Sequence, residues 1–89
     1  MANDIYSQGA ADALREVRRA HSLNTPLNSA HEGYAVLLEE LDELRAHVWM
    51  KPSMRDYAAM RHEAVQVAAA ALAFIAEVCD VELAQEPPK

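Results

Sequence analysis

The 89-residue sequence has little glycine, cysteine or aromatic content. It contains two glycines, one cysteine, one tryptophan, one phenylalanine and three tyrosines. The single cysteine, Cys79, excludes an internal disulfide framework and a multi-cysteine zinc site. Because it lies in the apolar run "FIAEVC", we expect a small buried side chain rather than a nucleophile. Scarce glycine, together with plentiful Ala, Leu, Glu and Arg, favours an all-α protein.

Positive charge and long apolar runs are also scarce. Eight Lys and Arg stand against fourteen Asp and Glu, for a net charge of −6. This balance argues against a general nucleic-acid-binding protein, which needs a basic surface to hold phosphates. The start, "MANDIYSQGA", lacks the apolar core of a signal peptide, and the run "VAAAALAFIA" is too short to span a bilayer. We therefore expect a cytoplasmic protein with no nucleic-acid or membrane partner.

Apolar residues recur at helical spacing in two segments before residue 50. The first segment runs from about residue 5 to 22, and an Asn- and Pro-containing loop follows at 22–28. The second helix is expected to start at Ser29, because "SAHE" has the capping-box form in which Glu32 reaches back. Pro52 ends it. Its expected core stripe is Tyr34, Leu37, Leu38, Leu41, Leu44 and Val48.

The third expected helix starts at Ser53, which has a second cap motif, "SMRD", and runs to about Leu83. Its middle, "AVQVAAAALAFIAEVC", is apolar on almost every side, so it must be covered on every side. Two other helices of this length cannot do so alone. The sequence therefore predicts one three-helix domain, 1–83, that forms a homodimer or a dimer of dimers as an oligomeric helical bundle. The tail, 84–89, is expected to be disordered.

Four carboxylates crowd into the middle of the second helix, in "LLEELDEL". At about 100° per residue, Glu40 and Glu43 lie side by side next to the leucine stripe. Asp42 lies on the other flank, and Glu39 points nearly opposite the leucines. Half-buried carboxylates about 6 Å apart repel by roughly 3 kcal/mol. Either the acidic face is solvated and this cost is small, or a cation belongs there.

The third helix repeats the three-residue step with Glu63 and Gln66. Two helices that each offer a pair of oxygen ligands one turn apart can build a carboxylate metal site in a bundle. Oxygen ligands without cysteine favour Mg²⁺ or Mn²⁺ over zinc. A solvated acidic face remains the alternative interpretation.

These acids resemble the signature of a known family. "EELDE" followed by "EAVQ" looks like the EExxE…ExxD pattern of the MazG-like all-α NTP pyrophosphatases, with nineteen residues between Glu43 and Glu63. The stretch "SAHEGYAVLLEELDEL" is similar to a subgroup of small MazG-related proteins. The resemblance covers roughly residues 10–80. It implies a MazG-like fold and Mg²⁺-dependent hydrolysis of nucleoside triphosphates to monophosphate and pyrophosphate, such as the clearing of unwanted nucleotides.

By position, the resemblance implies that Glu40, Glu43 and Glu63 are metal ligands and that Glu39 is a ligand or a water-positioning base. Gln66 stands where the family pattern has Asp. An amide oxygen can coordinate Mg²⁺ but carries no charge. The alternative function is therefore a non-catalytic helical oligomer on the same scaffold, acting as an interaction or nucleotide-binding module.

Basic side chains supply candidate substrate contacts. "REVRR" places Arg15, Arg18 and Arg19 in one patch, which is either a solvated face with local ion pairs or a clamp on a triphosphate bound across subunits. His31, at the start of the second helix, either is a surface residue or contacts phosphate or base. Lys51, just after the second helix, has the same two interpretations as the arginine patch.

Overall fold

The computed structural model describes residues 4–85, and all secondary structure in that range is helical. The predicted all-α class is therefore confirmed. In chain order the elements are α1 (Ser7–Leu23), α2 (Ala30–Val48), the 3₁₀ turn η1 (Pro52–Met54), α3 (Tyr57–Phe74), the π-helical turn η2 (Ile75–Asp80) and α4 (Val81–Ala84).

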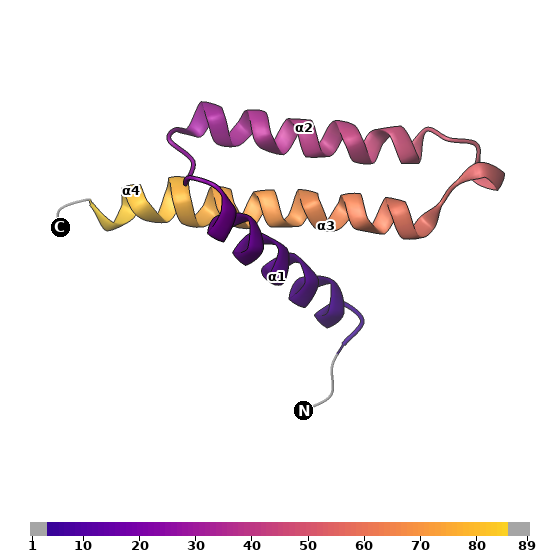
Figure 1. Cartoon of the computed structure of the whole chain (residues 1–89), viewed down its shortest axis with the longest axis horizontal. Helices are drawn as coiled ribbons and strands as arrows, with labels where there is room; N and C mark the ends of the chain where they lie inside the picture. The colour runs from indigo at the N-terminus through magenta and orange to yellow at the C-terminus, as the bar shows by residue number, and fades with distance from the viewer. Residues whose placement is uncertain (1–3, 86–89) are drawn as a thin grey trace.

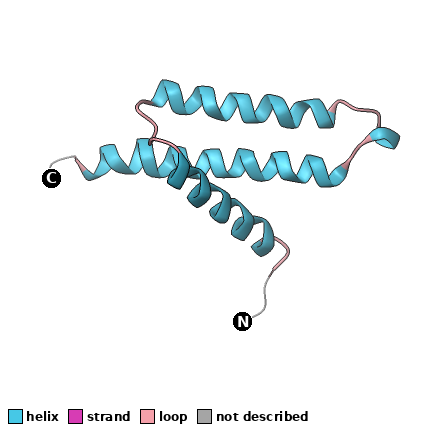
Figure 2. Ribbon diagram, viewed as in Figure 1, coloured by secondary structure: helices cyan, strands magenta, loops and turns pink. Residues whose placement is uncertain are grey.

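The helices α2 and α3 form an antiparallel hairpin, and α1 crosses α3 on one side of it (Figure 1). Short connections join these helices (Figure 2). The hairpin is tight where Gly33 meets Phe74, because a Cβ atom on Gly33 would lie 2.6 Å from Phe74 Cδ2. This close approach aligns the first half of α2 with the second half of α3.

The ends of the helices follow the sequence signals in part. The Ser29 side chain accepts a hydrogen bond from the Glu32 amide at 3.1 Å, as predicted. The Glu32 carboxylate instead accepts from the Asn28 amide at 3.1 Å, one residue before the cap. The prediction that Ser53 starts the third helix was wrong: Ser53 lies in η1, and Asp56 caps α3 by accepting from Ala59 N at 3.0 Å.

The C-terminal helix is longer than the apolar run in the sequence. From Tyr57 to Ala84 it continues for 28 residues and is long and apolar enough to cross a membrane. The length of the apolar run did not predict this, because Glu63 and Glu77 limit the run in the sequence but do not end the helix. The core helix of a soluble protein passes the same test. The predicted tail begins one residue too early, since Ala84 is helical, and residues 86–89 lie outside the described range.

Small residues make up the buried centre. Within residues 4–85 the buried positions are Ala13, Gly33 and Ala69, and no large side chain is fully buried. Cys79 is exposed, contrary to prediction. It lies in η2, whose main contacts are with α3 and α4, the helical segments on either side of it in the chain. The Cα radius of gyration is 15.5 Å, whereas a compact chain of this length has about 12 Å. The single chain is therefore elongated and thinly packed.

The predicted leucine stripe of α2 divides into two parts. Leu37, Leu44 and Val48 are half-buried, whereas Tyr34, Leu38 and Leu41 are exposed. The stripe is wider than one neighbouring helix can cover.

Candidate metal centre

Three carboxylates from two helices converge where α2 and α3 lie side by side. Glu40 and Glu43 lie one turn apart on α2, and Glu63 lies opposite them on α3. One carboxylate oxygen from each of the three residues lies within 4.8 Å of the corresponding oxygens of the other two. The structure thus brings together three of the four predicted metal ligands.

This cluster carries uncompensated negative charge. Burial raises the pKa of Glu40, and the neighbouring Glu43, Glu63 and Glu39 raise it further. Glu63 is half-buried, and its Oε2 atom is buried without a hydrogen-bond partner. Among residues 4–85, no salt bridge involves any of the three clustered carboxylates.

The donor set fits a hard divalent cation. Two oxygens on opposite sides of Mg²⁺, each about 2.1 Å from the ion, are about 4.2 Å apart. The three carboxylate oxygens lie no more than 4.8 Å apart, so at most small side-chain rotations would bring them within that distance. Two carboxylates about 5 Å apart repel by about 3 kcal/mol at an effective dielectric constant near 20. A cation would remove this repulsion and satisfy the buried Glu63 oxygen.

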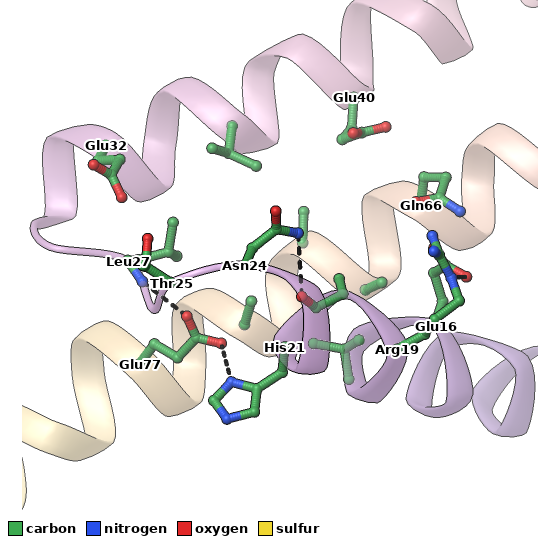
Figure 3. A pocket seen from close by; sticks show the side chains of 16 residues that line it. Glu16, Arg19, His21, Asn24, Thr25, Leu27, Glu32, Glu40, Gln66 and Glu77 are labelled. Carbon is green, nitrogen blue, oxygen red and sulfur yellow. Dashed lines mark hydrogen bonds and ion pairs between the residues drawn. The ribbon is translucent and has the colours of Figure 1, made fainter.

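Glu39 and Gln66 lie beside the cluster rather than in it. Glu39 is exposed, and its charge contributes to the raised pKa of Glu40. Gln66 lies between Glu40 and the Glu16–Arg19 pair (Figure 3). Arg19 lowers the pKa of Glu16, and the nearby Gln66 amide lowers it further. The Gln66 side chain therefore lies close to Glu16 of α1.

A cavity of about 420 Å³ adjoins Glu40 between α1, α2 and α3 (Figure 3). Ala69, Ala70 and Ala73 of α3 line one wall with small apolar side chains. The remaining lining is Glu16, Val17, Arg19, Ala20, His21, Asn24, Thr25, Leu27, Glu32, Val36, Glu40, Gln66 and Glu77. The cavity thus combines an apolar wall with a polar rim that ends at the candidate metal centre.

The loop between α1 and α2 is held at this cavity by Glu77 of η2. The Glu77 carboxylate accepts from the Leu27 amide at 2.9 Å and lies 3.8 Å from His21 Nδ1. Asn24 donates from Nδ2 to the Ala20 carbonyl at 3.1 Å. Sequence reasoning missed Asn24 and Thr25 as lining residues, because their polarity indicates a loop but not where that loop packs.

The predicted substrate arginines are partly committed to ion pairs within α1. Arg19 lines the cavity and donates from Nε to Glu16 at 3.2 Å. Arg15 pairs with Asp12 at 2.8 Å and lines a second, smaller cavity. The other three predicted substrate residues are exposed and line neither of these cavities: Arg18, His31 and Lys51.

Comparisons with known proteins give no match: no protein-family model, curated protein or solved structure matches this chain.

Proposed function

We propose that this protein is a Mg²⁺-dependent nucleoside triphosphate pyrophosphohydrolase with a MazG-like fold, acting in the cytoplasm. It would convert NTPs or dNTPs to the monophosphate and pyrophosphate. The observation that carries the proposal is the convergence of Glu40, Glu43 and Glu63 without a cationic partner in residues 4–85. The resemblance of the two acidic motifs to the MazG-like signature supports it.

Each acidic residue has a distinct role in this proposal. Glu40, Glu43 and Glu63 would hold Mg²⁺, and Mn²⁺ could replace it because the ligands are hard oxygens. A bound Mg²⁺ would neutralise the triphosphate, lower the pKa of a bound water and stabilise the leaving pyrophosphate. Glu39, exposed beside the cluster, would orient the attacking water from the solvent side. Because a ligand carboxylate must be ionised, metal affinity would increase as the pH rises through the raised pKa of Glu40.

The adjoining cavity suits the organic part of the substrate. Its volume of about 420 Å³ lies within the range of small-molecule pockets. The alanine wall offers an apolar surface for a base, and Arg19 offers a cation for the phosphates. The other four predicted substrate residues lie outside this cavity and would meet the triphosphate only across a subunit boundary: Arg15, Arg18, His31 and Lys51.

One observation favours the alternative, a non-catalytic helical oligomer that serves as an interaction or nucleotide-binding module. Gln66 stands at the position of the family's Asp, and its amide lies near Glu16 of α1, whose pKa it lowers. A site with one charged ligand fewer neutralises less of the cation's charge. In the alternative, the scaffold is kept while hydrolysis has lapsed.

The test is release of pyrophosphate and monophosphate from a panel of ribo- and deoxynucleoside triphosphates with Mg²⁺. We expect wild-type activity to fall by about a hundredfold or more in Glu40→Gln. Asp42→Asn is the matched control, because it removes one carboxylate from the same helix but outside the cluster. Its activity should stay at the wild-type level.

Two results would contradict the hydrolase proposal. If the wild type releases no pyrophosphate but Gln66→Asp does, the non-catalytic alternative is indicated. If neither the folded wild type nor Gln66→Asp releases pyrophosphate, hydrolysis of the substrates in the panel is excluded.

A further inference from the structure

Aromatic and methionine side chains are exposed together at the turn of the α2–α3 hairpin. The exposed fractions are 72%, 45%, 64% and 61% for Trp49, Met50, Met54 and Tyr57. All four belong to one stretch, 45–57, which runs from the last turn of α2 through η1 to the first residue of α3. This turn lies at one end of the longest axis of the molecule (Figure 1). We call residues 45–57 the hairpin tip.

The hairpin tip is basic, although the whole chain is acidic. It contains one acid, Asp56, and three basic residues: Arg45, Lys51 and Arg55. The other residues of the chain include five basic and thirteen acidic ones. Asp56 accepts a hydrogen bond from Ala59 N at the start of α3, so its charge lies against the positive end of the helix dipole. The tip therefore presents a local positive surface.

Polar contacts organise the hairpin tip. The half-buried Arg55 donates from Nη2 to the Val48 carbonyl at 2.9 Å, which ties the turn to the end of α2. Its Nη1 atom lies 3.5 Å from the Tyr57 hydroxyl oxygen. The Arg45 guanidinium lies 5.2 Å from the centroid of the Trp49 ring, which is a cation–π distance. Cationic and aromatic groups are thus held side by side before any partner binds.

We propose that the hairpin tip binds the surface of an anionic phospholipid bilayer. Tryptophan and tyrosine favour the membrane–water interface, because each has an apolar ring and a polar group. Arg45 and Lys51 would meet the anionic headgroups, and each basic residue near such a surface strengthens binding about fivefold. The tip contains no residue of the metal centre or of either cavity, so this inference does not rest on the proposed function.

The shape of the hairpin tip favours a bilayer over a peptide. Peptide ligands are usually held in a groove or at a sheet edge, and neither cavity described above includes a residue of 45–57. The molecule measures 55 × 37 × 27 Å along its principal axes. Its projecting end can therefore reach a flat surface that the rest of the chain does not touch.

The acidic part of the chain does not prevent this contact. Asp42 and Glu43 are the acids of α2 nearest to Trp49 in the chain, and they lie about 9–10 Å from it along the helix axis. This distance is about one Debye length at physiological ionic strength, so the acids are largely screened at the headgroups. The expectation of no membrane partner followed from whole-chain charge and from the length of the apolar run, and neither describes the tip.

Trp49 is the only tryptophan in the chain, so its fluorescence reports on the hairpin tip directly. The experiment titrates the full chain with vesicles of phosphatidylcholine, without or with phosphatidylserine, and repeats the second titration with brominated acyl chains. We expect binding to the phosphatidylserine vesicles alone, with a blue shift of the Trp49 emission and quenching by the brominated lipid. Binding should weaken as the salt concentration rises.

Two pairs of variants separate the hairpin tip from the rest of the chain. Lys51→Gln should weaken binding about fivefold. Arg18→Gln removes the same charge from an exposed site on α1 and should bind as the wild type does. Met54→Ser should weaken binding about tenfold. Leu83→Ser is its control, because Leu83 is 61% exposed and α4 lies at the opposite end of the molecule (Figure 1).

Four results would overturn the proposal. A folded wild type that binds neither kind of vesicle at low salt excludes lipid, and equal binding to both kinds excludes the basic residues as its cause. Bound protein whose Trp49 is neither shifted nor quenched excludes the tip as the contact. So does a control variant that loses as much binding as its tip counterpart. Protein that does not bind vesicles, but whose Trp49 is quenched by oligothymidylate, assigns the tip to single-stranded nucleic acid.

Discussion

The carboxyl group of Glu40 holds its proton more tightly in the folded chain than in water. Partial burial disfavours its charged form, and negative charge from Glu43, Glu63 and Glu39 adds to this effect. A carboxyl pKa that rises on folding means that the ionised group lowers the free energy of unfolding above that pKa. This cost disappears as the pH falls through the raised pKa. A divalent cation would remove the same cost at neutral pH.

Asp12 has the opposite shift. Hydrogen bonds from Arg61 and then Arg15 lower its pKa from 3.8 to about 2. The folded pKa lies below the unfolded one, so the carboxylate stabilises the fold above about pH 4, and this contribution is lost as the pH falls toward 2. The Arg61 bond, 2.8 Å long, joins α1 to α3. No pattern in the sequence indicated this pairing, because the two residues are 49 positions apart.

We expect the unfolding free energy of Asp12→Asn to depend less on pH in acid than that of the wild type. Urea unfolding of the wild type between about pH 4 and 2 should show a steeper loss of unfolding free energy than the variant shows. Glu39→Gln, at an exposed site that forms no ion pair within residues 4–85, is the control and should follow the wild type. Parallel pH profiles for Asp12→Asn and the wild type would show that the ion pair does not stabilise the fold.

At the scale of elements, local signals predicted the helices better than their ends. Ser29 was identified because a capping residue and the amide that it accepts from lie within four residues of chain. Ser53 and Asp56 both precede a helical pattern, and the choice depends on backbone geometry: Pro52 starts a 3₁₀ turn, and Arg55 is extended with ψ near 134°. The amino-acid composition alone therefore could not predict the break in helical structure before Asp56.

The contact between α2 and α3 at Gly33 predicts opposite effects for two glycine substitutions. A Cβ atom on Gly33 would lie 2.6 and 2.9 Å from two Phe74 ring atoms, whereas one on Gly9 of α1 would meet nothing within 4 Å. Overpacking lowers the free energy of unfolding by about 1–3 kcal/mol. The higher helix propensity of alanine relative to glycine raises it by up to about 1 kcal/mol. We expect Gly33→Ala to lose about 1 kcal/mol of unfolding free energy and Gly9→Ala to gain about 0.5–1 kcal/mol.

Chemical unfolding of the two alanine variants measures this difference directly. About 1 kcal/mol corresponds to a shift of about 4–8 °C in Tm for a domain of this size. Equal stabilisation of both variants would mean that Phe74 moves aside at no cost and that the hairpin is looser than the Gly33 contact indicates.

At the scale of the whole molecule, α3 is the element that both other long helices contact. The helical wheel placed Glu40, Glu43 and Glu63 on facing flanks because periodicity alone decides which residues share a face. The cavity could not be predicted, since its polar rim depends on where the loop with Asn24 and Thr25 returns to α3. Likewise, the sequence indicated that α3 needs cover, but only the structure identifies the side that α1 leaves open.

The central claim is that the three carboxylates hold a divalent cation. Calorimetric titration of Mg²⁺, repeated with Mn²⁺, into the wild type, Glu40→Gln and Asp42→Asn at neutral pH tests it most directly. We predict binding to the wild type, equal binding to Asp42→Asn, and affinity weakened by at least about tenfold in Glu40→Gln. A folded wild type that binds neither ion, or a Glu40→Gln variant that binds as tightly as the wild type, would contradict the account.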